Sequence, residues 1–268
     1  MVRNLVLAGG GFNAYTILGG LDELHSRGDL DDLECLAGAS AGAILSVFLA
    51  LGITPREICD FPQEVNAQCL VKPDPQALLT TGNFLSSEPI RVALTNLLGR
   101  FPDIVTLEDI RTRMGKDVTI VATDLETGSP VYFDADTAVQ HSIVDLLMAS
   151  ASLPLVFEPA VVGSRTFWDG CVSDPLPIQL YPVDGTLVVD LYYETAGVSL
   201  LLRFARMGSD AITRMKHEYH ADYRTVVLTK PTSLRKKGSV LECSTADKLS
   251  MFLSGQQQML KILKKDIN

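Results

Sequence analysis

The sequence predicts an α/β fold of three layers, in which helices cover both faces of a mostly parallel sheet. The first observation is a strand–helix–strand–helix pattern over the first fifty residues, which is typical of a parallel sheet. The second is that apolar strands continue to alternate with helices further along the chain. The third is that the 268 residues contain no repeat, linker or low-complexity tract. We therefore expect a single domain over residues 1–268.

The N-terminal unit begins with an apolar run at 5–8, which predicts a buried strand. A run of glycines at 9–11 follows, and a helix starts near Asn13. A second apolar strand at 35–38 leads directly into an apolar helix over 41–51. Two such strand–helix units in succession favour a parallel sheet covered by helices.

The remaining elements are predicted from apolar patterns, turn residues and helix-capping residues. Strands are expected at 118–123, 130–133, 161–162, 166–168, 187–190 and 225–228. Helices are expected after Thr54, over 89–99, after Thr106, over about 142–151, near 196–218 and from Ser244 to about Lys264. The segment 70–89 is rich in Pro, Gly, Ser and Thr and predicts a loop or lid.

Composition and charge narrow the class of protein. Apolar residues make up 47% of the chain and charged residues 21%, as is ordinary for a folded α/β protein. The net charge of -9 argues against nucleic acid as a partner, because a nucleic-acid binder needs a basic face. Five cysteines at irregular positions form no metal or disulfide pattern and predict reduced thiols in a cytoplasmic setting. No apolar run approaches the ~20 residues of a membrane span, and the N-terminal run is too short for a signal peptide.

The segment from Gly38 to Gly42, Gly-Ala-Ser-Ala-Gly, lies between the second strand and the apolar helix. This Gly-x-Ser-x-Gly pattern at a strand–turn–helix is typical of a nucleophile elbow, in which Ser40 is exposed at the tip. The first N–H groups of the helix lie beside such a serine and suit an oxyanion. The plain alternative is that small residues only allow the helix to pack tightly on the strand.

The glycine run is the second candidate motif. Backbone N–H groups of consecutive glycines turn readily toward a ligand, for example an oxyanion. Gly9, Gly11 and Ala14 also match the dinucleotide-binding fingerprint. That interpretation needs an acidic residue after the second strand, whereas Glu34 lies before it, so geometry disfavours a dinucleotide. A tight turn without any ligand remains an alternative.

A third stretch carries a resemblance to a known family. Residues 149–159 read Ala-Ser-Ala-Ser-Leu-Pro-Leu-Val-Phe-Glu-Pro, and Asp169-Gly170 follows a short predicted hairpin. Together with the glycine run, the Gly-x-Ser-x-Gly motif and the segment 121–128, this ordered set resembles the patatin-like phospholipases. The resemblance covers about residues 4–191, and we expect residues 192–268 to complete the same domain.

The resemblance implies a patatin-like fold and a lipid acyl hydrolase of the phospholipase A type. Such an enzyme uses a Ser–Asp dyad without histidine, passes through an acyl-serine intermediate, and needs no metal and no cofactor. Its substrate would be a phospholipid or another acyl lipid. The implied roles are: nucleophile, Ser40; base, Asp169; oxyanion donors, Gly10, Gly11 and Ala41; motif glycines, Gly9, Gly38, Gly42 and Gly170.

Two features qualify the match. A solvated aspartate is a weak base for a hydroxyl, so Asp169 must be desolvated or bonded closely to Ser40, and Trp168 is a candidate for that cover. Asn13 and Ala14 stand where the family usually has Arg or Lys followed by Gly, and Cys171 stands where Gly or Ala is frequent. We expect an altered substrate preference from these changes.

Two alternatives stay open. A Ser–Asp–His esterase would place a histidine after the acid, and His217 and His220 do follow Asp169. They lie in a long charged helical stretch, where surface histidines are the better expectation. A catalytically weak acyl-lipid binding protein is the other alternative, and the exchange at Asn13 motivates it.

Contact with a membrane surface is expected because long-chain acyl lipids reside in bilayers. The candidates for insertion are apolar residues of the predicted loop: Leu78, Leu79, Phe84 and Leu85. The net charge of -9 opposes attraction to anionic lipids, so apolar insertion is the expected mode of peripheral binding.

Overall fold

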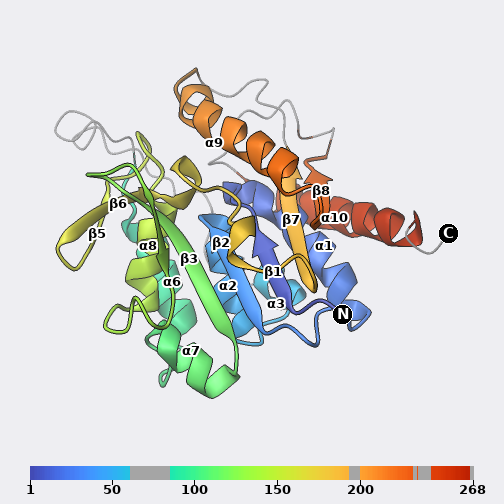
Figure 1. The fold of residues 1–268 in the computed structure, drawn as a ribbon, viewed down its shortest axis with the longest axis horizontal. Helices are drawn as coiled ribbons and strands as arrows, with labels where there is room; N and C mark the ends of the chain where they lie inside the picture. Colours follow the sequence, from blue (N-terminus) through green and yellow to red (C-terminus); the bar gives the residue numbers. More distant parts are fainter. Residues whose placement is uncertain (61–84, 193–199, 232–233, 235–242, 266–268) are drawn as a thin grey trace.

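A computed structural model describes residues 1–60, 85–192, 200–231, 234 and 243–265. An eight-stranded mixed sheet forms its centre (Figure 1), with the order β5-β6-β3-β2-β1-β7-β8 and with β4 paired to β3. The strands are β1 (Asn4–Leu7), β2 (Cys35–Ala39), β3 (Asp117–Asp124), β4 (Pro130–Phe133), β5 (Ala160–Val162), β6 (Arg165–Asp169), β7 (Thr186–Tyr192) and β8 (Arg224–Thr229). The five strands from β3 to β8 along this order are parallel, and β4, β5 and β6 add antiparallel pairs at one side.

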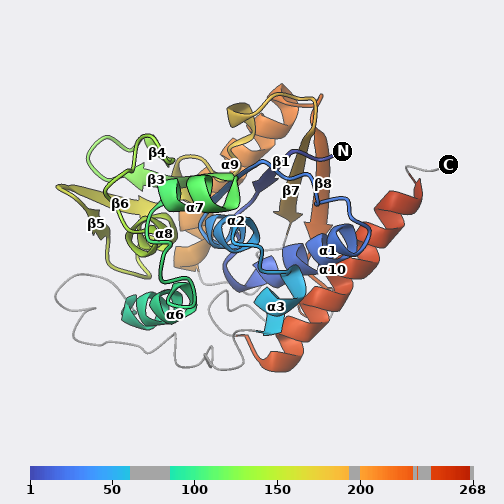
Figure 2. The same cartoon turned by 90° about the horizontal axis from the view of Figure 1, so that it is seen from below.

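The α-helices are α1 (Ala14–Ser26), α2 (Ala41–Ala50), α3 (Pro55–Asp60), α6 (Glu88–Leu98), α7 (Leu107–Met114), α8 (Ile143–Ala151), α9 (Leu200–Tyr219) and α10 (Thr245–Lys265). Short 3-10 turns are η1 (Gly11–Asn13), η3 (Gly170–Val172) and η4 (Ile178–Leu180). Figure 2 shows α1, α2, α3 and α10 together on one side of the sheet. The predicted fold class, a three-layer α/β/α arrangement around a mostly parallel sheet, is confirmed.

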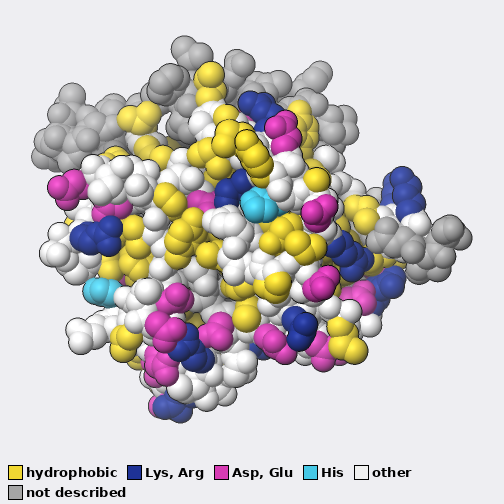
Figure 3. Space-filling model, in the orientation of Figure 1, with side chains coloured by type: hydrophobic (Ala, Val, Ile, Leu, Met, Phe, Trp, Pro, Cys, Tyr) yellow, Lys and Arg dark blue, Asp and Glu magenta, His cyan; other side chains and the backbone are white. Residues whose placement is uncertain are grey.

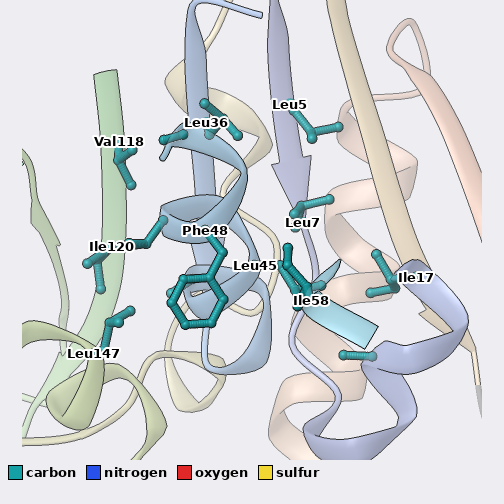
Figure 4. Close-up of a cluster of buried hydrophobic side chains, with 14 of the residues drawn as sticks. Leu5, Leu7, Ile17, Leu36, Leu45, Phe48, Ile58, Val118, Ile120 and Leu147 are labelled. Atoms are coloured by element: carbon teal, nitrogen blue, oxygen red, sulfur yellow. The ribbon is translucent and has the colours of Figure 1, made fainter. Parts of the chain in front are cut away.

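Strand β1 explains why the sheet is covered on both faces. Leu5 and Leu7 point into the large core on the side of α1 and α2, whereas Val6 packs with Leu176 and Ile178 on the other side. Both sets are fully buried, as expected when successive residues of a strand alternate between faces. Figure 4 shows how side chains of α2 fill the space between this helix and the strands; the labelled residues include Leu5, Leu7, Leu36, Leu45, Phe48 and Ile120.

The C-terminal elements build on the same sheet. β8 pairs with β7 in parallel register, and α10 packs against α1 so closely that a Cβ on Gly19 would lie 1.8 Å from the Phe252 carbonyl oxygen. In Figure 1, α9 crosses above the end of the sheet at which the parallel strands terminate. The carboxyl ends of parallel strands are where α/β proteins place their ligand sites.

The surface on the side of α9 carries hydrophobic, acidic and basic side chains. In Figure 3, hydrophobic side chains gather over the upper and central part of this face, near α9 and the sheet. Acidic and basic side chains are interspersed toward the lower edge, near α7. Among the described residues that Figure 3 colours, neither sign dominates this face, and they form no extended basic surface of the kind that nucleic acid requires.

Candidate active site

Ser40 lies at a sharp turn between β2 and α2. Its backbone has φ 55° and ψ -125°, a conformation that residues with a Cβ rarely adopt. The flanking glycines lie where a side chain would collide with backbone: a Cβ on Gly38 would lie 2.4 Å from the Gly42 carbonyl carbon, and one on Gly42 would lie 2.3 Å from the Leu7 oxygen. The expected strand–turn–helix is present, and its steric requirement for glycine is real.

Asp169 ends β6 and meets Ser40 across the sheet. The Ser40 hydroxyl donates a hydrogen bond of 2.7 Å to Asp169 Oδ2, and the backbone N–H of Cys171 donates one of 2.8 Å to Oδ1. The carboxyl is 2% exposed. Burial raises the pKa of Asp169 from 3.8 to about 6, although the hydrogen bonds from Ser40 and Cys171 lower it in part. Residues separated by more than a hundred positions thus form a serine hydroxyl paired with a carboxyl of increased basicity.

Glycines also close the site around this pair. A Cβ on Gly9 would lie 2.2 Å from Cys171 Sγ and 3.2 Å from Ser40 Cβ, so the first loop runs directly against the Ser40 turn. A Cβ on Gly170 would lie 2.2 Å from the Val121 carbonyl oxygen. The motif glycines predicted from sequence therefore all lie at close backbone approaches around Ser40 and Asp169.

The three predicted oxyanion donors lie in the two segments that flank Ser40. Gly10 and Gly11 follow Gly9 in the first loop, where Gly11 has φ 53°, and Ala41 is the first residue of α2. Within the described part of the chain, no residue accepts a hydrogen bond from the backbone N–H of any of these three. An N-terminal N–H of a helix has no partner inside the helix, so Ala41 offers its hydrogen to an external acceptor.

Asn13 stands where the family usually has Arg or Lys, and it is 3% exposed. Its backbone N–H donates to the Gly10 carbonyl and thereby closes the turn of the glycine loop. Its buried side-chain Nδ2 has no hydrogen-bond partner among the residues that the structure describes. Ala14, also buried, begins α1. A neutral, buried amide therefore stands at this position beside the glycine loop.

Backbone hydrogen bonds to residues that were not predicted as site residues anchor Ser40 and Asp169 from behind. The backbone N–H of Ser40 donates to Ser150 Oγ at 2.8 Å, and that of Asp169 donates to the Ser152 carbonyl at 2.8 Å. The Thr123 hydroxyl donates to the Asp169 carbonyl at 2.8 Å. The run Ala-Ser-Ala-Ser around Ser150 is visible in the sequence, but which atom each residue bonds depends on how α8 ends against the sheet.

The histidines of the described chain form no hydrogen bonds with the Ser40–Asp169 pair. Among the described residues, which include all four histidines, no histidine bonds to Ser40 or Asp169. His217 Nε2 lies 2.7 Å from Asp190 Oδ2, and this hydrogen bond raises the pKa of His217. The expectation that His217 is a surface histidine of the helix is therefore wrong in part: it ties α9 to a buried carboxyl on β7.

The predicted membrane-inserting loop receives one correction. Leu85 is 4% exposed and packs with Val156 and Phe157, and its N–H donates to the Val156 carbonyl. It is a buried residue, and the helix α6 begins soon after it at Glu88. Leu78, Leu79 and Phe84 lie outside the described residues.

Clusters of metal-ligating side chains and membrane-spanning helices are both absent from the described part of the chain. There, no group of three or more His, Cys, Asp or Glu side chains is arranged to hold a metal ion. None of the described helices combines the length and the hydrophobicity needed to cross a membrane.

A family model of the patatin-like phospholipases matches residues 5–180, well over half of the chain. The chain belongs to the patatin-like phospholipase family. The matched region includes the glycine loop, Ser40 and Asp169, and it ends at the last residue of η4. The resemblance inferred from the sequence motifs is confirmed.

Curated relatives are distant. A "Probable lipid hydrolase 463L" of Invertebrate iridescent virus 6 is 26% identical over 187 residues, covering 66% of this chain and 62% of that protein. An uncharacterised NTE family protein of Mycobacterium tuberculosis is 29% identical over 200 residues, covering 72% of this chain and 50% of that protein. The chain thus spans between half and two thirds of the length of these patatin-like relatives.

Solved structures share the fold at low sequence identity. VipD from Legionella pneumophila aligns with a TM-score of 0.60 at 17% identity, over 98% of this chain and 67% of that one. The type III effector ExoU aligns with a TM-score of 0.52 at 15% identity, over 98% of this chain and 53% of that one. Both likenesses concern the fold and extend beyond residue 180, over nearly the whole chain.

Proposed function

We propose that this protein hydrolyses acyl esters of lipids through Ser40 and Asp169, without a histidine. The observation that carries the proposal is the 2.7 Å hydrogen bond from the Ser40 hydroxyl to Asp169 Oδ2, made at a turn that presents a strained serine. Membership of the patatin-like phospholipase family supports a lipid as substrate. The relative named as a probable lipid hydrolase supports it too.

In the first half-reaction Asp169 accepts the proton of Ser40 while Oγ attacks the ester carbonyl carbon. The carbonyl oxygen gains negative charge, and the N–H groups of Gly10, Gly11 and Ala41 are the proposed donors to it. When the tetrahedral intermediate collapses, the proton passes from Asp169 to the leaving alcohol, and an acyl-serine remains. In the second half-reaction Asp169 accepts a proton from water while the water oxygen attacks the acyl-serine carbonyl carbon. The intermediate then collapses, Asp169 returns the proton to Ser40 Oγ as the C–Oγ bond breaks, and the fatty acid is released with the hydroxyl and the carboxylate restored.

The buried state of Asp169 is what makes it a useful base. With a pKa of about 6 the carboxylate accepts a proton more readily than a solvated aspartate does, yet it remains ionised at neutral pH. The chemistry is complete with these groups, so the proposal includes no metal and no cofactor. A phospholipid, cleaved as by a phospholipase A, is the proposed substrate, reached by peripheral contact with a membrane from the cytoplasm.

The test uses an active-site probe and a soluble substrate together. We expect a fluorophosphonate probe to label the parent protein on Ser40, located by mass spectrometry, and the parent to hydrolyse a short p-nitrophenyl ester and phospholipid vesicles. Ser40→Ala should lose labelling and both activities. Ser26→Ala is the matched control, because Ser26 is an exposed serine at the end of α1 whose hydroxyl donates to the Glu23 carbonyl, and the variant should behave as the parent.

Two outcomes would contradict the proposal. Residual turnover by Ser40→Ala within tenfold of the parent would exclude Ser40 as the nucleophile. A parent that is neither labelled nor active, although folded, would favour the acyl-lipid binding protein suggested by the neutral Asn13 at the glycine loop.

A further inference from the structure

Ser150 lies in the last turn of α8 and is completely buried, at 0% exposure. Its Oγ accepts the backbone N–H of Ser40 at 2.8 Å and donates to the Val121 carbonyl of β3 at 2.6 Å. A hydroxyl has only one hydrogen to donate. Because that hydrogen is committed to Val121, the lone pairs of Oγ are directed to Ser40, and the orientation of this bridge is fixed.

The turn at Ser40 needs such a bridge. β2 ends at Ala39 and α2 begins at Ala41, so neither the ladder of the sheet nor the helix supplies an acceptor for the Ser40 N–H. The backbone there has φ 55°, which a residue with a Cβ adopts only when its surroundings enforce it. The Ser40 N–H points at the completely buried Ser150. Without that hydroxyl the N–H would lack its acceptor, which is unfavourable, so the strained turn would relax.

The same backbone torsions set the geometry of the chemistry. They aim Ser40 Oγ toward Asp169 and orient the adjacent N–H of Ala41. Asp169 is held by the same frame, since its N–H bonds to the carbonyl at the end of α8 and Thr123 of β3 bonds to its carbonyl. Ser150 is therefore the direct link that ties the Ser40 turn to the elements that already hold Asp169.

We propose that Ser150 is a positioning residue for the hydrolysis: it fixes the backbone of Ser40 relative to Asp169 and touches no substrate. This inference rests on the proposed function. It also makes a claim about the Ser40 backbone that stands without any activity.

The matched control is Ser46, another completely buried serine. Its hydroxyl donates to the Gly42 carbonyl within its own helix, at 2.9 Å. Ser150→Ala and Ser46→Ala each remove one buried hydroxyl, but only the first removes the partner of the Ser40 N–H. A role limited to stability would affect the two variants alike.

On a short soluble ester, Ser150→Ala should lower kcat by about 10- to 100-fold, the loss typical of a small misplacement of a reacting group. Its KM should change by less than about threefold, because Ser150 does not reach the substrate. Ser46→Ala should keep kcat within about threefold of the parent, whatever its thermal stability. In hydrogen–deuterium exchange of the folded proteins, the peptide that contains Ser40 should exchange faster in Ser150→Ala and not in Ser46→Ala.

Ser150→Cys guards against a variant that fails to fold, because it keeps the volume of the site and weakens the hydrogen bonds. It should show the same pattern with a smaller loss of kcat. The proposal is overturned if Ser150→Ala or Ser150→Cys keeps the kcat of the parent, or if Ser46→Ala loses as much kcat and exchange protection at Ser40 as Ser150→Ala does. If instead the parent itself is inactive, the proposed function fails, and the exchange of the Ser40 peptide still decides whether Ser150 holds the turn.

Discussion

Asp169 and Asp190 are both buried on strands, and each is paired with a different kind of group. Asp169 on β6 accepts a hydrogen bond from the Ser40 hydroxyl. Asp190 on β7 is paired with the imidazole of His217 on α9. The chain therefore contains the three side chains of a Ser–His–Asp triad, but it distributes them over two separate pairs.

The two pairs differ in which group has its pKa raised. Among the described residues, no cationic group bonds to Asp169: the Ser40 hydroxyl and the Cys171 backbone N–H donate to it, and burial raises its pKa to about 6. At the other pair it is the His217 imidazole that responds, with its pKa raised by the Asp190 carboxyl. Asp169, kept from water by burial, is the proposed base, and Asp190 holds α9 to β7 through His217.

The comparison shows that proximity of an acid and a histidine does not by itself make a catalytic pair. The neighbouring residue Lys216 forms an ion pair of 2.6 Å with the buried Asp174, just after η3. Lys216 and His217 thus bind α9 to the body of the protein at two adjacent points. This context favours a structural role for His217, while Ser40, the proposed nucleophile, is paired with Asp169.

The largest expected effect separates the two aspartates. Asp169→Asn should lower kcat/KM for a soluble ester by about 10²- to 10⁴-fold, the typical contribution of a general base. An asparagine fits the same site, because its oxygen accepts from Cys171 and its amide donates to Ser40 Oγ. The variant should stay folded and gain up to about 3 kcal/mol above pH 6, since it removes a buried charge.

Asp190→Asn is the matched control for that experiment. It should keep most of the activity and lower the thermal midpoint, because it weakens the attachment of α9. If Asp190→Asn lost activity as severely as Asp169→Asn, the assignment of the two pairs to different tasks would be wrong.

The second prediction tests whether the glycine loop packs closely against Ser40. Gly9→Ala should lower kcat by about 100-fold, because the new methyl group would meet Cys171 Sγ at 2.2 Å and Ser40 Cβ at 3.2 Å. Combining it with Cys171→Ala should restore only part of the activity, since the contact with Ser40 remains. The measurement is kcat of the single and double variants, compared as a double-mutant cycle.

Gly208 on α9 is the control for Gly9, because it is a glycine with open space around it. Nothing lies within 4 Å of a Cβ placed there. Gly208→Ala should leave kcat unchanged and stabilise the helix by about 0.5–1 kcal/mol. Equal losses of activity at Gly9 and Gly208 would mean that the glycine loop is not specially close-packed around Ser40.

The smallest expected effect is that of His217→Ala on activity, less than about threefold, as for a side chain remote from the reacting atoms. Its consequence lies in the pH dependence of stability. Because the pKa of His217 is raised in the folded state, its ion pair stabilises the parent fully below the unfolded pKa near 6.5 and loses this contribution as pH rises through the folded pKa. Thermal midpoints of parent and variant should differ most at pH 5 to 6 and converge at higher pH; a constant difference would contradict the ion-pair account.

The local sequence was sufficient for the features that depend on neighbouring residues. Gly38, Ser40 and Gly42 specify a strand–turn–helix because the backbone approaches at 2.3–2.4 Å leave no space for a Cβ. The strands and helices were predictable from apolar alternation and from caps such as Thr106, whose hydroxyl accepts the N–H of Asp109. The juxtaposition of Ser40 with Asp169 was expected only through the family resemblance.

Features that depend on tertiary packing were not predictable in this way. The bond from Ser40 to Ser150 and the pair of His217 with Asp190 each join distant segments, and the residue types alone do not select them. Trp168 was the expected cover for Asp169, but adjacent residues of a strand point to opposite faces, so it lies on the other side of β6. Leu85 was expected in an exposed loop and is instead buried against Val156 and Phe157.

The most direct test of the central claim, that burial and not a histidine makes Asp169 the base, is the pH profile of kcat/KM for a soluble ester. Asp169 accepts a proton only when ionised, so kcat/KM should rise with pH through a midpoint at about 6 and stay level above it. His217→Ala should show the same midpoint. Activity that stays level down to pH 4 would contradict a base with a raised pKa, and a midpoint that disappears in His217→Ala would show that the histidine is the base after all.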